Sequence, residues 1–226
     1  MSTEIIVVDN GAAEFSERVI EAFHHRPTES FSVALSGGGT ARRCYERLAA
    51  DGCDQIDWWQ VDVYWSDERC VPPDSAESNE RLVRESLLER VGAANAVYPM
   101  RCEDGPDPYQ QRIASVGRLD LVHLGLGADG HTASLFPGST ALDADPGRLV
   151  ATNRDPTGRN PHDRITLTYS GIARARTVIF TVEGEAKRQA FASAIAADPA
   201  CPAARVVADR IVWLVNPAAA GEGRPR

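Results

Sequence analysis

Apolar residues recur along the chain in short continuous runs, separated by segments whose apolar positions have helical spacing. Near-continuous apolar runs are typical of strands covered on both faces. They predict strands over residues 4–8, 31–36, 61–66, 119–126, 164–168, 178–182 and 211–215. The intervening segments predict helices over residues 12–25, 40–50, 76–91, 108–116 and 184–196. This alternation predicts an α/β sandwich with a mostly parallel sheet.

The length of 226 residues and a hydrophobic content of 43% fit one core, so residues 1–226 are expected to form a single domain. Asp74 and Glu77 offer a capping box for the helix at 76–91. Residues 143–163 are rich in polar and turn-forming residues and predict a long surface loop that acts as a lid. Residues 217–226 are expected to be a frayed tail.

The chain is acidic, because its 24 Lys and Arg and 32 Asp and Glu give a net charge of −8. Such a surface disfavours binding to nucleic acid or to an anionic membrane. No apolar stretch approaches the roughly 20 residues of a membrane-spanning helix. An anionic substrate would therefore require a locally basic pocket. Lys187 is the one lysine, and it either persists by chance or marks a site that needs a compact charge.

The five cysteines predict neither a disulfide framework nor a zinc site, since their number is odd and no Cys-x-x-Cys occurs. We expect reduced thiols and a cytoplasmic location. The N-terminus carries Glu4 and only a short apolar run, which is unlike a signal peptide.

Two polar loops follow predicted strands. The first, Ser36-Gly-Gly-Gly-Thr40, presents backbone N–H groups at a helix start, where a phosphate binds well. It is neither a Walker loop nor G-x-G-x-x-G, and a plain strand-to-helix turn is the alternative. The second places Asp67, Glu68 and Arg69 together, which indicates either a site or a solvated loop.

A third loop, from Gly125 to Gly138, follows the apolar run at 119–124 and carries His131 after three glycines. Glycines permit a sharp turn and close approach to a ligand, and histidine moves protons near neutral pH. A helix starting at Thr132 would keep His131 neutral through its dipole. A hydrogen-bonded structural histidine is the alternative, and that role is expected for His123 inside the strand.

The last candidates are Arg164, which opens a predicted strand, and Lys187, which falls in the first turn of a predicted helix. A cation is unfavourable at that end of a helix dipole. This conflict indicates an external anion, and simple solvent exposure of Lys187 is the alternative.

Taken in order, these segments resemble the 6-phosphogluconolactonase family over most of the chain. The matching stretches are Leu35-Ser-Gly-Gly-Gly-Thr40, Trp65-Ser-Asp-Glu-Arg-Cys-Val-Pro72, Ser78-Asn79, the run from Leu124 to Gly138, Arg164-Ile-Thr-Leu167 and Gly184 to Lys187. The chain departs from the family's usual pattern at Ala41, Ala128 and Asn216, which affects loop geometry rather than a proposed acid, base or phosphate ligand.

The resemblance implies the three-layer fold shared with glucosamine-6-phosphate deaminases and ribose-5-phosphate isomerases. It implies hydrolysis of 6-phospho-D-glucono-1,5-lactone to 6-phosphogluconate in the oxidative pentose phosphate pathway, with no metal and no organic cofactor. A monomer is expected, with a weak dimer as the alternative.

We expect His131 to act as the general base for water attack on the lactone carbonyl, and Asp129 either to orient His131 or to fix the turn through backbone bonds. Either Arg69 or the backbone N–H groups of Gly38 and Gly39 would stabilise the oxyanion. By the same resemblance, the substrate and its phosphate would be held by Ser36, Gly38, Gly39, Thr40, Asp67, Arg164 and Lys187.

Two other functions remain open from the sequence. A glucosamine-6-phosphate deaminase resembles the chain at Asp67, Asp129 and His131, but such enzymes carry a glutamate where this chain has Phe136. A non-catalytic sugar-phosphate-binding protein is the second alternative. Related regulators usually carry an added DNA-binding segment, for which this acidic chain has no room.

Overall fold

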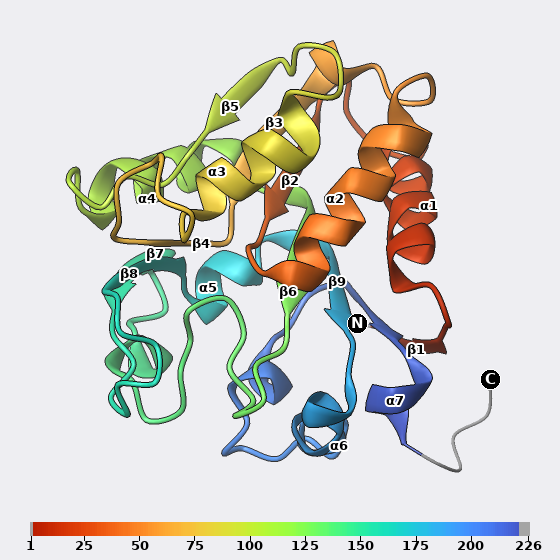
Figure 1. Ribbon diagram of the computed structural model, residues 1–226. Coiled ribbons are helices and arrows are strands. Elements are labelled where there is room, and N and C mark those ends of the chain that lie inside the picture. Colours follow the sequence, from red (N-terminus) through yellow and green to blue (C-terminus); the bar gives the residue numbers. More distant parts are fainter. Residues whose placement is uncertain (1, 222–226) are drawn as a thin grey trace.

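The computed structural model describes residues 2–221, and a seven-stranded parallel sheet forms its centre (Figure 1). The strand order is β1-β10-β9-β6-β2-β3-β5, and each neighbouring pair is parallel. This confirms the expected mostly parallel α/β sheet. The bounds are β1 (Ser2–Val7), β2 (Phe31–Leu35), β3 (Val61–Trp65), β5 (Ala96–Tyr98), β6 (Leu119–Gly125), β9 (Ala175–Val182) and β10 (Arg210–Val215).

Helices flank this sheet because parallel strands need crossover connections, which are right-handed. The α-helices are α1 (Gly11–His24), α2 (Gly39–Gly52), α3 (Asn79–Val83), α4 (Pro106–Val116), α5 (Tyr169–Ile172), α6 (Arg188–Ile195) and α7 (Pro217–Ala220). Short 3₁₀-helices lie at Trp58–Gln60, Thr140–Asp143, Glu185–Lys187 and Pro202–Arg205, and one π-helical turn at Arg84–Leu88. The α7 helix falls within the segment predicted as a tail, of which residues 222–226 lie outside the described residues.

A second, antiparallel sheet lies beside the central one, with the order β4-β8-β7 (Figure 1). Its strands are β4 (Asp67–Arg69), β8 (Arg164–Leu167) and β7 (Val150–Asn153). The expectation of one structureless loop over 143–163 is wrong, because β7 interrupts it. β4 escaped prediction because its three residues are charged and carry no apolar pattern.

The start of α3 differs from the predicted capping box. The Ser78 hydroxyl accepts the Arg81 N–H at 3.1 Å, so Ser78 caps the helix. The buried Glu68 carboxylate accepts further amides at the same helix end. The prediction of Asp74 and Glu77 as a capping box is wrong, because Glu68 arrives from β4 through the tertiary fold.

His123 is a structural histidine, as expected. It lies fully buried in β6, with Nδ1 2.8 Å from the Tyr45 hydroxyl and Nε2 2.9 Å from the Thr181 hydroxyl. Burial lowers the pKa of His123 to about 3, so the ring is neutral.

Cys70 and Cys102 form a disulfide, with their Cα atoms 5.4 Å apart. The expectation that all five thiols are reduced is wrong for this pair. A separation of 32 residues hides their proximity in the sequence, and the fold brings them together. Cys44 and Cys201 are buried free thiols, and Cys53 is an exposed one.

We expect the Cys70→Ser variant to lose about 3–4 kcal/mol of unfolding free energy, because a cross-link over 32 residues restricts the unfolded chain. Denaturant unfolding under non-reducing conditions measures this loss. Cys53→Ser, which removes an exposed free thiol, is the control and should match the wild type. Equal midpoints for all three proteins would contradict a stabilising disulfide.

Candidate active site

Loops at the carboxyl ends of the strands surround a cavity of about 190 Å³. It lies where the connections of the sheet diverge, since β2 leads to β3 on one side and β6 leads to β9 on the other. Ligands bind at such switch points in open α/β sheets. Most of the predicted site residues line this cavity: Ser36, Gly38, Asp67, Arg69, His131, Arg164 and Lys187.

The remaining predicted residues lie close by. Gly39 and Thr40 line an adjoining cavity that shares Gly38 and Lys187 with the first. Asp129 lies against the ring of His131. The sequence analysis missed the lining residues Asn79, Ser134 and Asn160. Asn79 and Ser134 stood in quoted motifs without being assigned to the site, and no pattern in the sequence marked Asn160.

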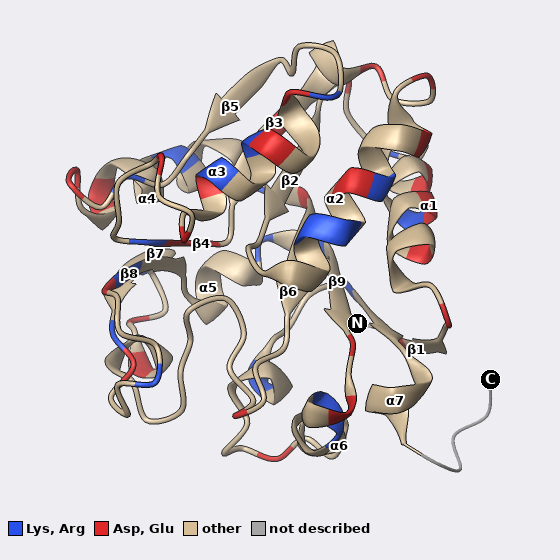
Figure 2. Ribbon diagram, viewed as in Figure 1, with Lys and Arg blue, Asp and Glu red and all other residues tan. Residues whose placement is uncertain are grey.

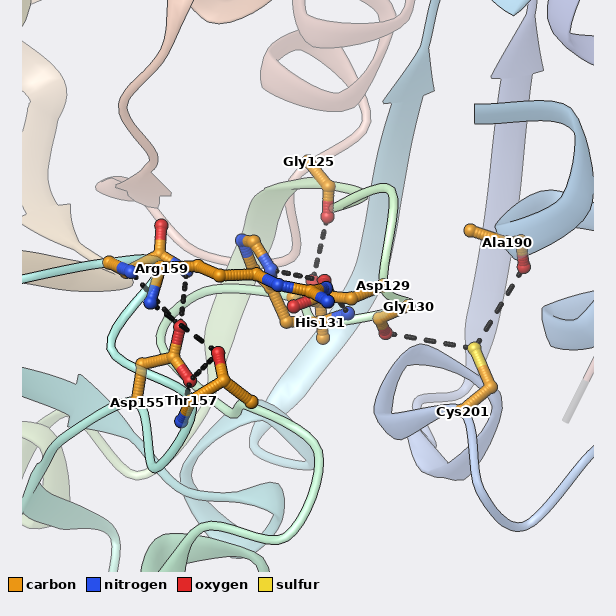
Figure 3. A network of polar contacts seen from close by, with 11 residues as sticks. Gly125, Asp129, Gly130, His131, Asp155, Thr157, Arg159, Ala190 and Cys201 are labelled. Carbon is orange, nitrogen blue, oxygen red and sulfur yellow. Dashed lines mark hydrogen bonds and ion pairs between the residues drawn. The ribbon is translucent and has the colours of Figure 1, made fainter. Parts of the chain in front are cut away.

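The turn after β6 presents His131 with a fixed orientation. Its Nδ1 lies 2.6 Å from Oδ1 of Asp129, and the same oxygen accepts the His131 backbone N–H at 3.1 Å (Figure 3). The hydrogen bond from His131 lowers the pKa of Asp129, so this carboxylate is ionised and only accepts. In the neutral form of the ring, Nδ1 therefore carries the proton, and Nε2 has a lone pair for an external proton.

Backbone contacts close the turn around this pair. The Gly127 N–H donates to the His131 carbonyl at 2.7 Å, and Gly130 has a φ of +86°, which favours glycine. No helix begins at Thr132, which instead bridges Leu135 in a tight turn. Asp129, rather than a helix dipole, fixes the tautomer of His131.

Phe136 packs beside the histidine, with ring centroids 5.0 Å apart. It is almost fully buried and also lines the cavity. An apolar ring thus covers one side of His131, where it limits the access of water to the imidazole.

Arg164 is a buried cation that faces the cavity. Its residue is 5% exposed, and among residues 2–221 its Nε finds no hydrogen-bond partner and its guanidinium no ion pair. Burial lowers the pKa of Arg164, although an arginine remains charged. Polar groups buried this deeply normally have partners, so the geometry favours an anionic ligand here.

The three charged residues of β4, Asp67, Glu68 and Arg69, have different roles. Asp67 is buried and accepts the Ser134 hydroxyl at 2.5 Å. Glu68 turns to the start of α3, and burial raises its pKa despite the amides that it accepts. Arg69 lines the cavity, and its Nη1 donates to the Glu77 carbonyl at 2.6 Å. The triplet is thus a part of the site rather than a solvated loop.

Acidic and basic side chains mix along α1, α2 and α3 (Figure 2), where ion pairs such as Arg18–Glu14 link them. Lys187 has no ion pair within the described part of the chain and lines both cavities, as expected of a cation kept for a ligand.

In residues 2–221 no group of three His, Cys, Asp or Glu side chains is arranged to hold a metal ion. The same residues contain no helix long and apolar enough to cross a membrane.

Residues 3–213 match the family described as glucosamine-6-phosphate isomerases/6-phosphogluconolactonase. The chain belongs to this family. A 6-phosphogluconolactonase of Nostoc sp. is 37% identical over 210 residues, which cover 85% of this chain and 84% of that protein. The 6-phosphogluconolactonase of Mycobacterium tuberculosis is 36% identical over 84% of each chain.

Solved structures agree with this placement in the glucosamine-6-phosphate isomerase/6-phosphogluconolactonase family. The 6-phosphogluconolactonase of Thermotoga maritima superposes with a TM-score of 0.84 at 29% identity, over 96% of this chain and all of that one. A monomeric glucosamine-6-phosphate deaminase superposes with a TM-score of 0.82 at 16% identity over 97% of this chain and 99% of its own, which shows a shared fold alone. The fold implied by the sequence resemblance is confirmed.

Proposed function

We propose that the protein is a 6-phosphogluconolactonase, which hydrolyses 6-phospho-D-glucono-1,5-lactone to 6-phosphogluconate in the oxidative pentose phosphate pathway. One observation carries this proposal: the same cavity is lined by His131, whose Nδ1 contacts Asp129 and leaves Nε2 free, and by a buried arginine without an ion pair. The first suits the activation of water, and the second suits a phosphate. The relatives named 6-phosphogluconolactonase, at 36–37% identity, support the same activity.

In the proposed reaction, Nε2 of His131 takes a proton from the water that attacks C1 of the lactone. The imidazolium that forms is stabilised by the ionised Asp129 at 2.6 Å. His131 then returns the proton to the ring oxygen as the bond between C1 and that oxygen breaks. The products are an alcohol and a carboxylic acid, which releases its proton to the solvent to become a carboxylate, and no step needs a metal or an organic cofactor.

The phosphate end of the substrate is assigned to Arg164 and Lys187. Lys187 borders both cavities, so its ammonium group can reach a phosphate held between Arg164 and the start of α2. That helix has Gly38 at its N-cap and no side-chain cap, which leaves the amides around Gly39 and Thr40 for phosphate oxygens. Ser36 and Asp67 border the sugar between the two ends.

The reaction centre needs a donor for the charge that develops on the carbonyl oxygen. Arg69 lines the cavity and keeps part of its guanidinium free beside the bond to Glu77. The Gly38 amide lies on the same wall, at a φ of +101°. We propose Arg69 as a catalytic residue in this role, with the amide as its neighbour.

Glucosamine-6-phosphate deamination is a weaker proposal. The deaminases that the chain resembles carry a glutamate at the position that the buried ring of Phe136 occupies here. Initial rates on freshly made 6-phosphogluconolactone, corrected for spontaneous hydrolysis, test the assignment beside ammonia release from glucosamine 6-phosphate. The proposal predicts lactone hydrolysis alone, and ammonia release alone would overturn it. Tight binding of 6-phosphogluconate without turnover would favour a binding protein.

A cytoplasmic location and a monomeric state remain proposals. The Cys70–Cys102 disulfide bears on the first, because such bonds persist in oxidising compartments. Thiol labelling of the protein in intact cells, followed by mass spectrometry, distinguishes a reduced pair from an oxidised one.

Gly127→Ala is expected to lower kcat about 100-fold while the protein stays folded. A Cβ atom at residue 127 would overlap Nδ1 of His131 and lie 2.6 Å from Oδ1 of Asp129. The pair must shift, and a misplacement of about 1 Å costs roughly 10²-fold in rate. Gly147→Ala, where a Cβ meets nothing within 4 Å, is the control for kcat and Tm. An unchanged kcat in Gly127→Ala would contradict the proposed need for this geometry.

A further inference from the structure

A buried carboxylate, that of Asp155, cross-links the loop between β7 and β8, which borders the cavity at Asn160. Asp155 accepts the backbone N–H and the hydroxyl of Thr157 at 2.8 and 2.7 Å. It also accepts the backbone N–H and the side-chain amide of Asn160 at 3.0 and 2.8 Å. Burial alone would raise the pKa of Asp155, but these four hydrogen bonds outweigh it and lower that pKa to about 2. The loop is therefore held in one conformation at neutral pH.

The anchored loop also carries Arg159, next to Asn160 in the chain. Asn160, the next residue, lines the cavity together with His131. The exposed side chain of Arg159 extends from the loop toward His131 and Asp129 (Figure 3). Within residues 2–221 its guanidinium makes neither an ion pair nor a hydrogen bond, and only its backbone N–H bonds to Thr157. The unpaired guanidinium of Arg159 thus points toward His131, the proposed general base.

We propose that Arg159 is a further catalytic residue, whose guanidinium binds the C1 oxygen as it becomes an oxyanion and then the product carboxylate. This inference rests on the proposed lactonase function. Arg164 and Lys187 already supply two cations for the phosphate, and Arg69, the oxyanion donor proposed above, has Nη1 bonded to the Glu77 carbonyl, so Arg159 is a second donor beside it. Arg159 reaches the opposite end of the ligand, where negative charge appears only during the reaction. A planar guanidinium pairs well with a carboxylate.

Kinetics with two lactones test whether Arg159 contacts the carbonyl end or the phosphate end of the substrate. Removal of an oxyanion donor costs roughly 10²–10³-fold in kcat at a buried site, and for the exposed Arg159 we expect about 10²-fold. Arg159→Ala should show this loss equally with 6-phosphogluconolactone and with unphosphorylated glucono-1,5-lactone, and Arg159→Lys should recover part of it. Arg154→Ala is the control, because Arg154 is an exposed arginine of the same loop that pairs with Asp163 and lines a different cavity.

Binding measurements separate this inference from the proposed function, because they need no turnover. Arg159→Ala should weaken 6-phosphogluconate about tenfold, the scale of one hydrogen bond to a charged group. It should leave D-glucitol 6-phosphate, which lacks the carboxylate, unchanged. Equal weakening of both ligands would assign Arg159 to the phosphate and overturn the inference, as would constants equal to those of Arg154→Ala. A wild type without lactonase activity would sink the proposed function, while the pair of ligands still decides the contact of Arg159.

Discussion

Replacing His131 with alanine is expected to lower kcat for 6-phosphogluconolactone by roughly 10²–10⁴-fold, the usual contribution of a positioned general base. The physical reason is the loss of Nε2, which the contact of Nδ1 with Asp129 leaves free to accept a proton from water. Rates corrected for spontaneous hydrolysis measure the change. The ring is partly exposed and lies on a loop, so its removal should spare the fold.

Binding of 6-phosphogluconate separates catalysis from recognition in this variant. Arg164 and Lys187 are unchanged in His131→Ala, so the affinity for the product should stay close to that of the wild type. A folded variant with near-native kcat would remove His131 from the base role. A variant that also loses product binding would instead give His131 a part in recognition.

Replacing Arg164 with methionine is expected to raise KM for 6-phosphogluconolactone about 10- to 100-fold, since hydrogen bonds to charged groups contribute about 1.5–3 kcal/mol. Methionine fills the buried position without a charge, so β8 should keep its packing. Values of kcat and KM on the phosphorylated and unphosphorylated lactones measure the effect, which should be confined to the phosphorylated one.

Arg176→Met provides the matched control, because Arg176 sits in β9, pairs with Asp120 at 3.4 Å and lines a different cavity. Its kinetic constants should equal those of the wild type. If Arg164→Met raises KM equally for both lactones, Arg164 contacts the sugar rather than the phosphate.

The sequence predicted the parallel sheet well because six of its seven strands are continuous apolar runs, which need no tertiary information. It missed β5, a three-residue edge strand of that sheet, and also β4 and β7, whose residues pair with β8 but carry no apolar pattern of their own. It missed the Cys70–Cys102 disulfide for a similar reason, since only the fold brings the two cysteines together.

The candidate site was predictable where glycines and charged residues follow apolar runs, as at His131 and Asp67. The structure of the turn around His131 was not, because the chain forms a tight turn at Thr132 and Asp129 contacts Nδ1 of the ring. Asn160 and Arg159 lie in a polar loop without periodicity. Asp155 holds this loop through local hydrogen bonds to Thr157 and Asn160, but only the fold brings Asn160 to the cavity.

The most direct test of the account is the release of acid from freshly prepared 6-phosphogluconolactone at neutral pH, followed for wild type and His131→Ala at equal enzyme concentration. The account predicts that the wild type accelerates hydrolysis far above the spontaneous rate and that the folded variant loses at least 99% of this acceleration, the lower bound for a general base at about 10²-fold. Equal acceleration by the two proteins, or none by the wild type, would contradict it.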